Sequence, residues 1–219
     1  MKYDLYARAV RLVFKKGFRR GLVAAHGAVW ASDVMDKSAR LYREIVLRSP
    51  GIGGRQNPLT INVLTAAFVA AIFRASMGKL SPRELGAVFS EAGDRSAIFR
   101  LFARLSSRKN FTREWQDKRN RLALESQGRG FAADFVSEFV YGKTPNEYGI
   151  VYRECGICKL LEREQCAEIA PQMCKFDYVT AKHAGWVLTR SKTIADGDGV
   201  CDFWFAKKGG GTATGRGFP

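Results

Sequence analysis

The residues best suited to chemistry lie close together in the second half of the chain. All five cysteines fall between Cys155 and Cys201, and no cysteine precedes them. Carboxylates and glycine turns lie beside these thiols, as in Cys174-x-x-Asp177 and in the Asp-Gly-Asp-Gly turn of residues 196–199. The thiolate is the nucleophilic form of cysteine, and neighbouring charges set its pKa. This segment is therefore the predicted reactive site.

Two of these side chains are predicted to share one face of a helix. Cys174 and Asp177 are three residues apart in a predicted helix over 171–184, so they lie one turn from each other. Cys201 begins a predicted strand directly after the glycine turn. A thiol in this position is a candidate nucleophile, and a carboxylate beside it is a candidate proton carrier. We predict Cys174, Asp177 and Cys201 as the catalytic residues.

The cysteines also allow other interpretations. Cys155 and Cys158 have the spacing of zinc ligands, and three further cysteines are available to complete a site. The spacings that follow match no common zinc finger or ribbon, and a redox Cys-x-x-Cys would need a βαβ setting that the sequence does not indicate. We predict no metal and no cofactor, with zinc as the alternative. Cys158 and Cys166 are predicted to pack as small buried hydrophobic residues.

The composition limits the class of protein. The formal net charge of +15 lies entirely in residues 1–130, while residues 131–219 are neutral overall. The basic residues alternate with apolar ones at helical spacing, which is typical of a solvated helix face, and no nucleic-acid-binding motif is present. We expect no nucleic-acid partner. The most apolar run, 59–73, is shorter than the about 20 residues of a membrane span, so we expect no membrane association. An odd number of cysteines and no convincing targeting segment favour a cytoplasmic protein with reduced thiols.

The elements that must position these side chains follow from periodicity and breakers. Residues 3–18 read as a helix that Gly17 and Gly21 are expected to end. Ser32-Asp33 is expected to cap a helix to about Leu47, and an apolar helix follows over 59–77. Further predicted helices begin at the capping box Ser81-Pro82-Arg83-Glu84, at Asp94 and at Thr112.

The second half has a different pattern. Strands are predicted over 131–141, 148–153, 186–193 and 201–206, the last two joined by the tight turn at 196–199, with helices over 158–164 and 171–184. The predicted fold class is α+β, a helical N-terminal part followed by a small antiparallel sheet with helices packed on one face. We expect a basic helical N-terminal extension (1–57), a main domain (58–207, helical over 58–130 and α+β over 131–207) and a flexible Gly-rich tail (208–219).

Several stretches together resemble the L-2-amino-thiazoline-4-carboxylic acid hydrolase family. They include Glu154-Cys155-Gly156-Ile157-Cys158-Lys159-Leu160-Leu161, Pro171-Gln172-Met173-Cys174-Lys175-Phe176-Asp177-Tyr178, the segment from Leu188 to Gly197, and Cys201-Asp202-Phe203. The helix from Pro58 and the following Leu80-Ser81-Pro82-Arg83-Glu84-Leu85 are also similar to the N-terminal half of the family. The resemblance covers roughly residues 58–207.

The resemblance implies an enzyme that hydrolyses a C–N or C–S bond of a small cyclic amidine, such as a thiazoline ring. Cys201 or Cys174 as thiolate would attack the amidine carbon while Asp177 holds the amidine or relays a proton. Alternatively, Asp177 or Glu154 would activate water and the cysteines would only line the pocket.

The expected partner is a small-molecule substrate that bears a carboxylate, and a homo-oligomer is left open. We expect Arg190 to bind that carboxylate and Glu154, Cys155 and Asp202 to contact the substrate. The second functional class that we consider is a non-catalytic small-molecule-binding or sensor module similar to four-vinyl-reductase-like domains.

Overall fold

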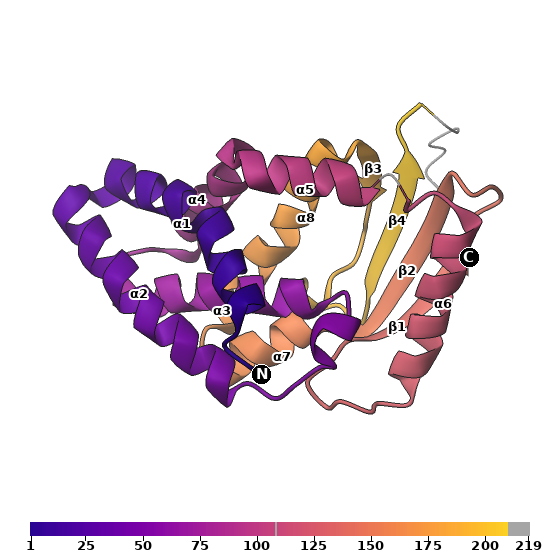
Figure 1. Cartoon of the computed structure of the whole chain (residues 1–219), viewed down its shortest axis with the longest axis horizontal. Helices are drawn as coiled ribbons and strands as arrows, with labels where there is room; N and C mark the ends of the chain where they lie inside the picture. The colour runs from indigo at the N-terminus through magenta and orange to yellow at the C-terminus, as the bar shows by residue number, and fades with distance from the viewer. Residues whose placement is uncertain (108, 210–219) are drawn as a thin grey trace.

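The computed structural model describes residues 1–107 and 109–209, and it shows an α+β fold. A helical N-terminal part is followed by an antiparallel sheet in the order β1-β2-β4-β3, which confirms the predicted fold class. In Figure 1, α1, α2 and α4 lie on the left, the strands lie on the right, and α8 runs between them. The helices are α1 (Leu5–His26), α2 (Ala28–Arg48), α3 (Thr60–Ala75), α4 (Pro82–Arg95), α5 (Ala97–Ser107), α6 (Arg113–Gln127), α7 (Gly156–Arg163) and α8 (Ala170–Ala184). The strands are β1 (Val136–Tyr141), β2 (Glu147–Glu154), β3 (Trp186–Thr189) and β4 (Cys201–Lys207).

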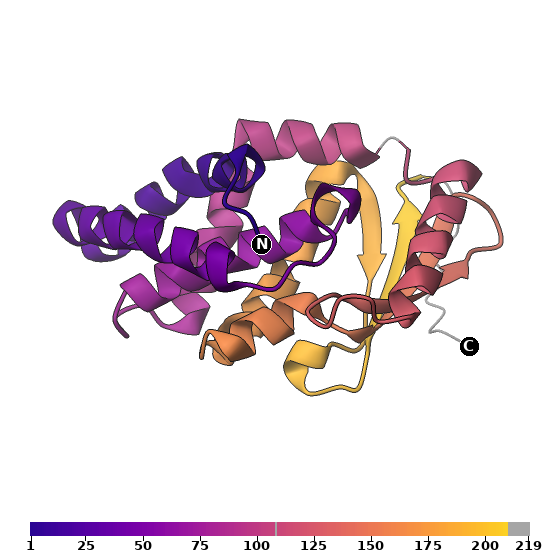
Figure 2. The same ribbon diagram turned by 60° about the horizontal axis from the view of Figure 1, so that its bottom comes forward.

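One face of the sheet is aromatic. The register of β2 with β4 places Tyr148 and Tyr152 on the same face as Phe203 and Phe205, because alternate residues of a strand point to the same side. Trp115 of α6 contacts Tyr148 on this face, with ring centroids 5.2 Å apart. The helix α8 packs near β3, at the other edge of the sheet (Figure 2). The sheet thus presents an aromatic wall to the helices.

The central helix of the helical part is α3. Its sequence is apolar on nearly all sides, and α1, α2 and α7 pack against it. Phe68 of α3 contacts Phe18 of α1 and Tyr42 of α2 through edge-on ring pairs. The first two helices therefore share one hydrophobic core with α3 and α4.

The helix α1 continues to His26, so the prediction that Gly17 and Gly21 end it is wrong. Both glycines face α4 at very close range. An ideal Cβ on Gly17 would lie 2.6 Å from the Cα of Ala92, and one on Gly21 would lie 2.7 Å from the Cγ1 of Val88. Glycine costs a helix about 1 kcal/mol relative to alanine. Here it allows two helices to approach more closely than any side chain would permit.

We expect Gly17→Ala to destabilise the fold by about 1–3 kcal/mol, the usual cost of overpacking a tight core. The contact is with backbone of α4, which cannot rotate away. Gly51→Ala is the matched control, since its added Cβ would meet no atom within 4 Å. Chemical unfolding of both variants measures the difference. A Gly17→Ala protein as stable as the wild type would contradict the close approach.

The structure also corrects the predicted start of α2. The helix begins at Ala28, directly after Gly27, so Ser32 and Asp33 lie inside it instead of capping it. Gly27 has φ of 86°, a conformation that glycine adopts without strain. This single residue lets the chain turn from α1 into α2 without a loop.

The ends of α4 show one confirmed prediction and one error. Ser81 and Glu84 form the predicted capping box, with the Ser81 amide donating to the Glu84 carboxylate at 2.9 Å. Asp94 does not start a helix but lies within α4, and α5 begins after Ser96. The Asp94 carboxylate instead connects α4 to α8 through a hydrogen bond with the side chain of His183 at 2.7 Å.

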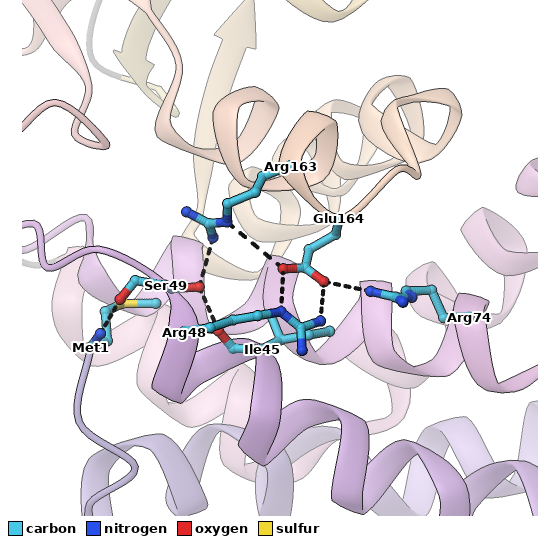
Figure 3. A network of polar contacts seen from close by, with 7 residues as sticks. All are labelled: Met1, Ile45, Arg48, Ser49, Arg74, Arg163 and Glu164. Atoms are coloured by element: carbon cyan, nitrogen blue, oxygen red, sulfur yellow. Dashed lines mark hydrogen bonds and ion pairs between the residues drawn. The ribbon is translucent and has the colours of Figure 1, made fainter.

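A buried carboxylate connects α7 to α2 and α3. Glu164, at the end of α7, is 1% exposed and accepts hydrogen bonds from Arg48 at 3.0 Å and from Arg74 at 2.6 Å (Figure 3). Arg163 approaches the same carboxylate to 3.8 Å and donates to the hydroxyl of Ser49 at 2.7 Å. Three cations thus converge on one anion that has almost no contact with solvent.

Within residues 1–107 and 109–209, none of the helices has the length and apolar character needed to cross a lipid bilayer. From residue 210 onward, the predicted flexible tail lies outside the part of the chain that the structure describes.

Candidate functional site

The helix α8 presents the predicted catalytic pair near the sheet. Cys174 and Asp177 lie one turn apart, as their spacing predicts. The chain leaves β3 at Thr189, and the next residue, Arg190, turns back toward α8. Its guanidinium donates to the Asp177 carboxylate at 2.9 Å and to the carbonyl of Cys174 at 3.2 Å. A buried arginine therefore joins the start of the β3–β4 connection to α8.

The connection between β3 and β4 differs from the prediction. The strand β3 ends at Thr189 instead of residue 193, and a 3-10 turn at Ile194–Asp196 replaces a simple tight turn. Two interactions explain this. Arg190 is drawn to Asp177, and the Asp202 carboxylate accepts hydrogen bonds from the amide and hydroxyl of Ser191.

The guanidinium of Arg190 is enclosed. Its side chain is 5% exposed, and the rings of Tyr178 and Phe203 lie 5.4 Å and 4.9 Å from its charge centre. Aromatic faces and a carboxylate are the surroundings that stabilise a buried arginine. Arg190 is thus held in place by Asp177 and by the two aromatic rings.

Asp177 is the most perturbed carboxylate of the site. Its side chain is 41% accessible to solvent, and the surrounding protein removes part of its hydration. This desolvation raises the pKa of Asp177 to about 6, although the charge of Arg190 opposes the change. A carboxylate with a pKa near neutrality exchanges protons readily at physiological pH, which is the property of a general base.

The neighbouring thiols are protonated at neutral pH. Burial raises the pKa of Cys201 to about 11 and raises that of Cys174 further, where the charge of Asp177 adds to the effect. A hydrogen bond with Cys158, followed by burial, raises the pKa of Cys155 well above its usual value. The Sγ of Cys201 also accepts a hydrogen bond from the amide of Ile194 at 3.2 Å. All five cysteines are free thiols.

The structure brings together most of the predicted site residues. Three of the thiols lie close enough to raise one another's pKa: Cys155, Cys174 and Cys201. The charges of Asp177 and Arg190 also shift the pKa values of Cys174 and Cys201. Two predicted substrate contacts, Glu154 and Asp202, bind other residues of the chain in this structure. Glu154 forms ion pairs with Lys159 at 2.5 Å and Arg129 at 2.8 Å, and Asp202 binds the chain at residues 191–192.

A cavity of about 300 Å³ adjoins Asp177. Its walls come from α1, α3, α4, α5 and α8, with Ile157 at the start of α7. Met173, Phe176, Asp177 and Thr180 of α8 line it because residues three and four apart share a helix face. Asp177 is the one charged residue among the described residues that line this space.

The sequence interpretation missed three contributors to the site. Tyr152 of β2 is half-buried beside the thiols, and desolvation raises its pKa. Phe14 of α1 and Phe99 of α5 form walls of the cavity. The apolar spacing of α1 and α5 is equally typical of ordinary core packing, so no signal in the sequence marks them as cavity residues.

A metal centre was the main alternative use of the thiols. In the described part of the chain, no three His, Cys, Asp or Glu side chains are grouped so that they could hold a metal ion.

Comparison with known proteins adds one finding to this geometry. The family model described as L-2-amino-thiazoline-4-carboxylic acid hydrolase matches residues 62–205. The matched region begins in α3 and ends in β4, so it contains Asp177, Arg190 and the whole thiol cluster. Searches of curated proteins and of solved structures returned no match. The family match covers well over half of the chain, which therefore belongs to the L-2-amino-thiazoline-4-carboxylic acid hydrolase family.

Proposed function

We propose that this protein is a hydrolase that opens a small cyclic amidine of the thiazoline type at a C–S or C–N bond, with Asp177 as its general base. One observation carries the proposal. Asp177 borders a mainly apolar cavity, has a pKa raised to about 6, and is held by Arg190 at 2.9 Å. Family membership supports the reaction class.

The reaction follows from the chemistry of the carboxylate. Ionised Asp177 takes a proton from water while the water oxygen bonds to the amidine carbon of the protonated substrate. The C=N electron pair moves onto nitrogen, which gives a neutral tetrahedral adduct. Collapse of the adduct to a carbonyl breaks the bond to the ring sulfur or nitrogen, which receives the proton from Asp177. The hydroxyl proton leaves to solvent, so one water is consumed and the carboxylate is regenerated.

In this mechanism Arg190 is a positioning residue. Its donors face Asp177 and the Cys174 carbonyl, and its side chain is almost fully buried. By donating to one oxygen of Asp177, Arg190 fixes the orientation of the carboxylate. It also limits the rise in the pKa of Asp177, so that the group is largely ionised at pH 7.

A thiol nucleophile is the second mechanism, favoured by the gathering of Cys155, Cys174 and Cys201 near Asp177. A protonated thiol is a weak nucleophile, so this path would require Asp177 to remove the thiol proton during attack. The two mechanisms differ in whether the sulfur is needed.

The Cys174→Ser/Cys201→Ser double variant separates them. We expect it to keep at least a third of the wild-type kcat for ring opening of a 2-aminothiazoline, measured by the release of free thiol. The wild-type rate should fall about tenfold for each pH unit below about 6, because the base becomes protonated. Loss of more than a hundredfold in the double variant would favour the thiol mechanism. No ring opening of any cyclic amidine by the wild type would favour the non-catalytic binding module.

A further inference from the structure

The cavity beside Asp177 is mainly apolar, and its described lining residues carry charge of one sign only. Its walls are mainly aliphatic and aromatic, and its polar side chains other than Asp177 are uncharged. These uncharged polar residues are Tyr6, Asn62, Thr65, Ser106 and Thr180. Among the described residues, no lysine or arginine lines the space. A ligand inside it therefore meets one negative group and an apolar surface.

The carboxylate has an unused oxygen. Arg190 donates to Oδ2 of Asp177, and no hydrogen bond to Oδ1 is formed among the described residues. A cationic nitrogen that donates to Oδ1 would complete the pairing of this carboxylate. A ligand carboxylate at the same place would face a like charge in a desolvated recess, where such repulsion is poorly screened.

The mouth of the cavity lies between α1 and α5. The lining residues Ala9, Ile98 and Phe102 are exposed, whereas Phe14 and Met173 are buried. In Figure 1, α5 crosses in front of the upper part of α8. Among the exposed lining residues, Ala9, Ile98 and Phe102 are apolar, and Asn62 and Ser106 are polar but uncharged. The entrance therefore suits a ligand with a mainly apolar body.

We propose that this cavity binds a mainly apolar molecule with a single cationic head, an amidine or an amine, which pairs with Asp177 while the body packs against Phe14, Phe99 and Phe102. This rests on the proposed function and narrows its substrate class to cyclic amidines with an apolar substituent and no carboxylate inside the cavity. A cavity of 150 Å³ holds benzene, so a volume of about 300 Å³ accommodates on the order of twelve non-hydrogen atoms.

Benzamidine and benzoate test the proposal, because they have nearly the same size and shape and opposite charge. Isothermal titration calorimetry on the full chain should show benzamidine binding at least tenfold more tightly than benzoate. Asp177→Asn should weaken benzamidine binding at least tenfold, while Asp36→Asn, at an exposed position in α2, should leave it unchanged. Affinity for benzamidine should also fall as the pH drops below about 6, since a protonated Asp177 no longer attracts a cation.

A second pair of variants tests the location. Ala9→Trp narrows the mouth at an exposed position and should weaken benzamidine binding at least fivefold. Ala24→Trp makes the same change at an exposed position of α1 that does not line the cavity, and it should have no effect. Benzoate binding as tightly as benzamidine, or an Ala9→Trp protein that binds benzamidine normally, would overturn the proposal.

The binding result is independent of turnover. A protein that binds benzamidine in the expected pattern but opens no cyclic amidine would contradict the proposed hydrolase and leave the cavity assignment intact. A protein that opens the ring but prefers benzoate would contradict the ligand class and leave the hydrolase intact.

Discussion

Replacing Asp177 by asparagine is expected to lower kcat for ring opening by about 10²–10⁴-fold, the contribution of a positioned general base. Asparagine has the size of aspartate, and its carbonyl oxygen still accepts from Arg190, which donates at 2.9 Å in the wild type. The amide cannot take a proton from water. The pH dependence below about 6 should therefore disappear from the residual rate, because the titrating group is gone.

Loss of the charge has a second consequence that must be separated from catalysis. Arg190 is 5% exposed, so Asp177→Asn leaves a buried cation without its anion and should lower the thermal midpoint. The double variant Asp177→Asn/Arg190→Gln removes both charges and should recover part of the stability without recovering activity. An Asp177→Asn protein whose kcat lies within threefold of the wild type would eliminate Asp177 as the base.

Glu164→Gln is expected to destabilise the fold by about 3 kcal/mol, near the low end for breaking a buried ion pair. Glu164 is 1% exposed, whereas Arg48 and Arg74 are 43% and 40% exposed, so solvent moderates the cost. Glutamine leaves three converging cations without an anion. Glu162→Gln, at an exposed position of the same helix, is the control and should change stability by no more than about 0.5 kcal/mol.

The stability that Glu164 contributes should depend on pH in a definite direction. Burial would raise the pKa of Glu164, but the hydrogen bond from Arg48 and the charges of Arg48, Arg74 and Arg163 hold it below its usual value. A depressed pKa contributes stability that is present above the unfolded value, about 4.5, and is lost as the pH falls through the folded value. Chemical unfolding should show a constant difference between wild type and Glu164→Gln above pH 5.5 and a shrinking difference below it. A difference that grows toward acid pH would contradict the ion-pair account.

The sequence by itself determined the fold class and the local elements. The capping box at Ser81, the apolar run of α3 and the alternation in β2 and β4 depend on neighbours in the chain, so periodicity and caps predict them. Cys174 and Asp177 share a helix face for the same reason. Local order was sufficient for these elements, but it misplaced the start of α2 and the cap at Asp94.

Contacts between distant segments were decided only by the tertiary structure. Gly17 and Gly21 resemble helix ends in the sequence, and the approach of α4 shows instead why no side chain fits there. The sequence suggested Arg190 as a partner for a substrate carboxylate, but its burial against Asp177 depends on how β3 ends and where α8 lies. The same is true of the cavity, whose walls come from six helices between residue 5 and residue 184. The raised pKa of Asp177 is likewise a property of this assembled recess, because desolvation depends on every atom nearby and not on the order of residues in the chain.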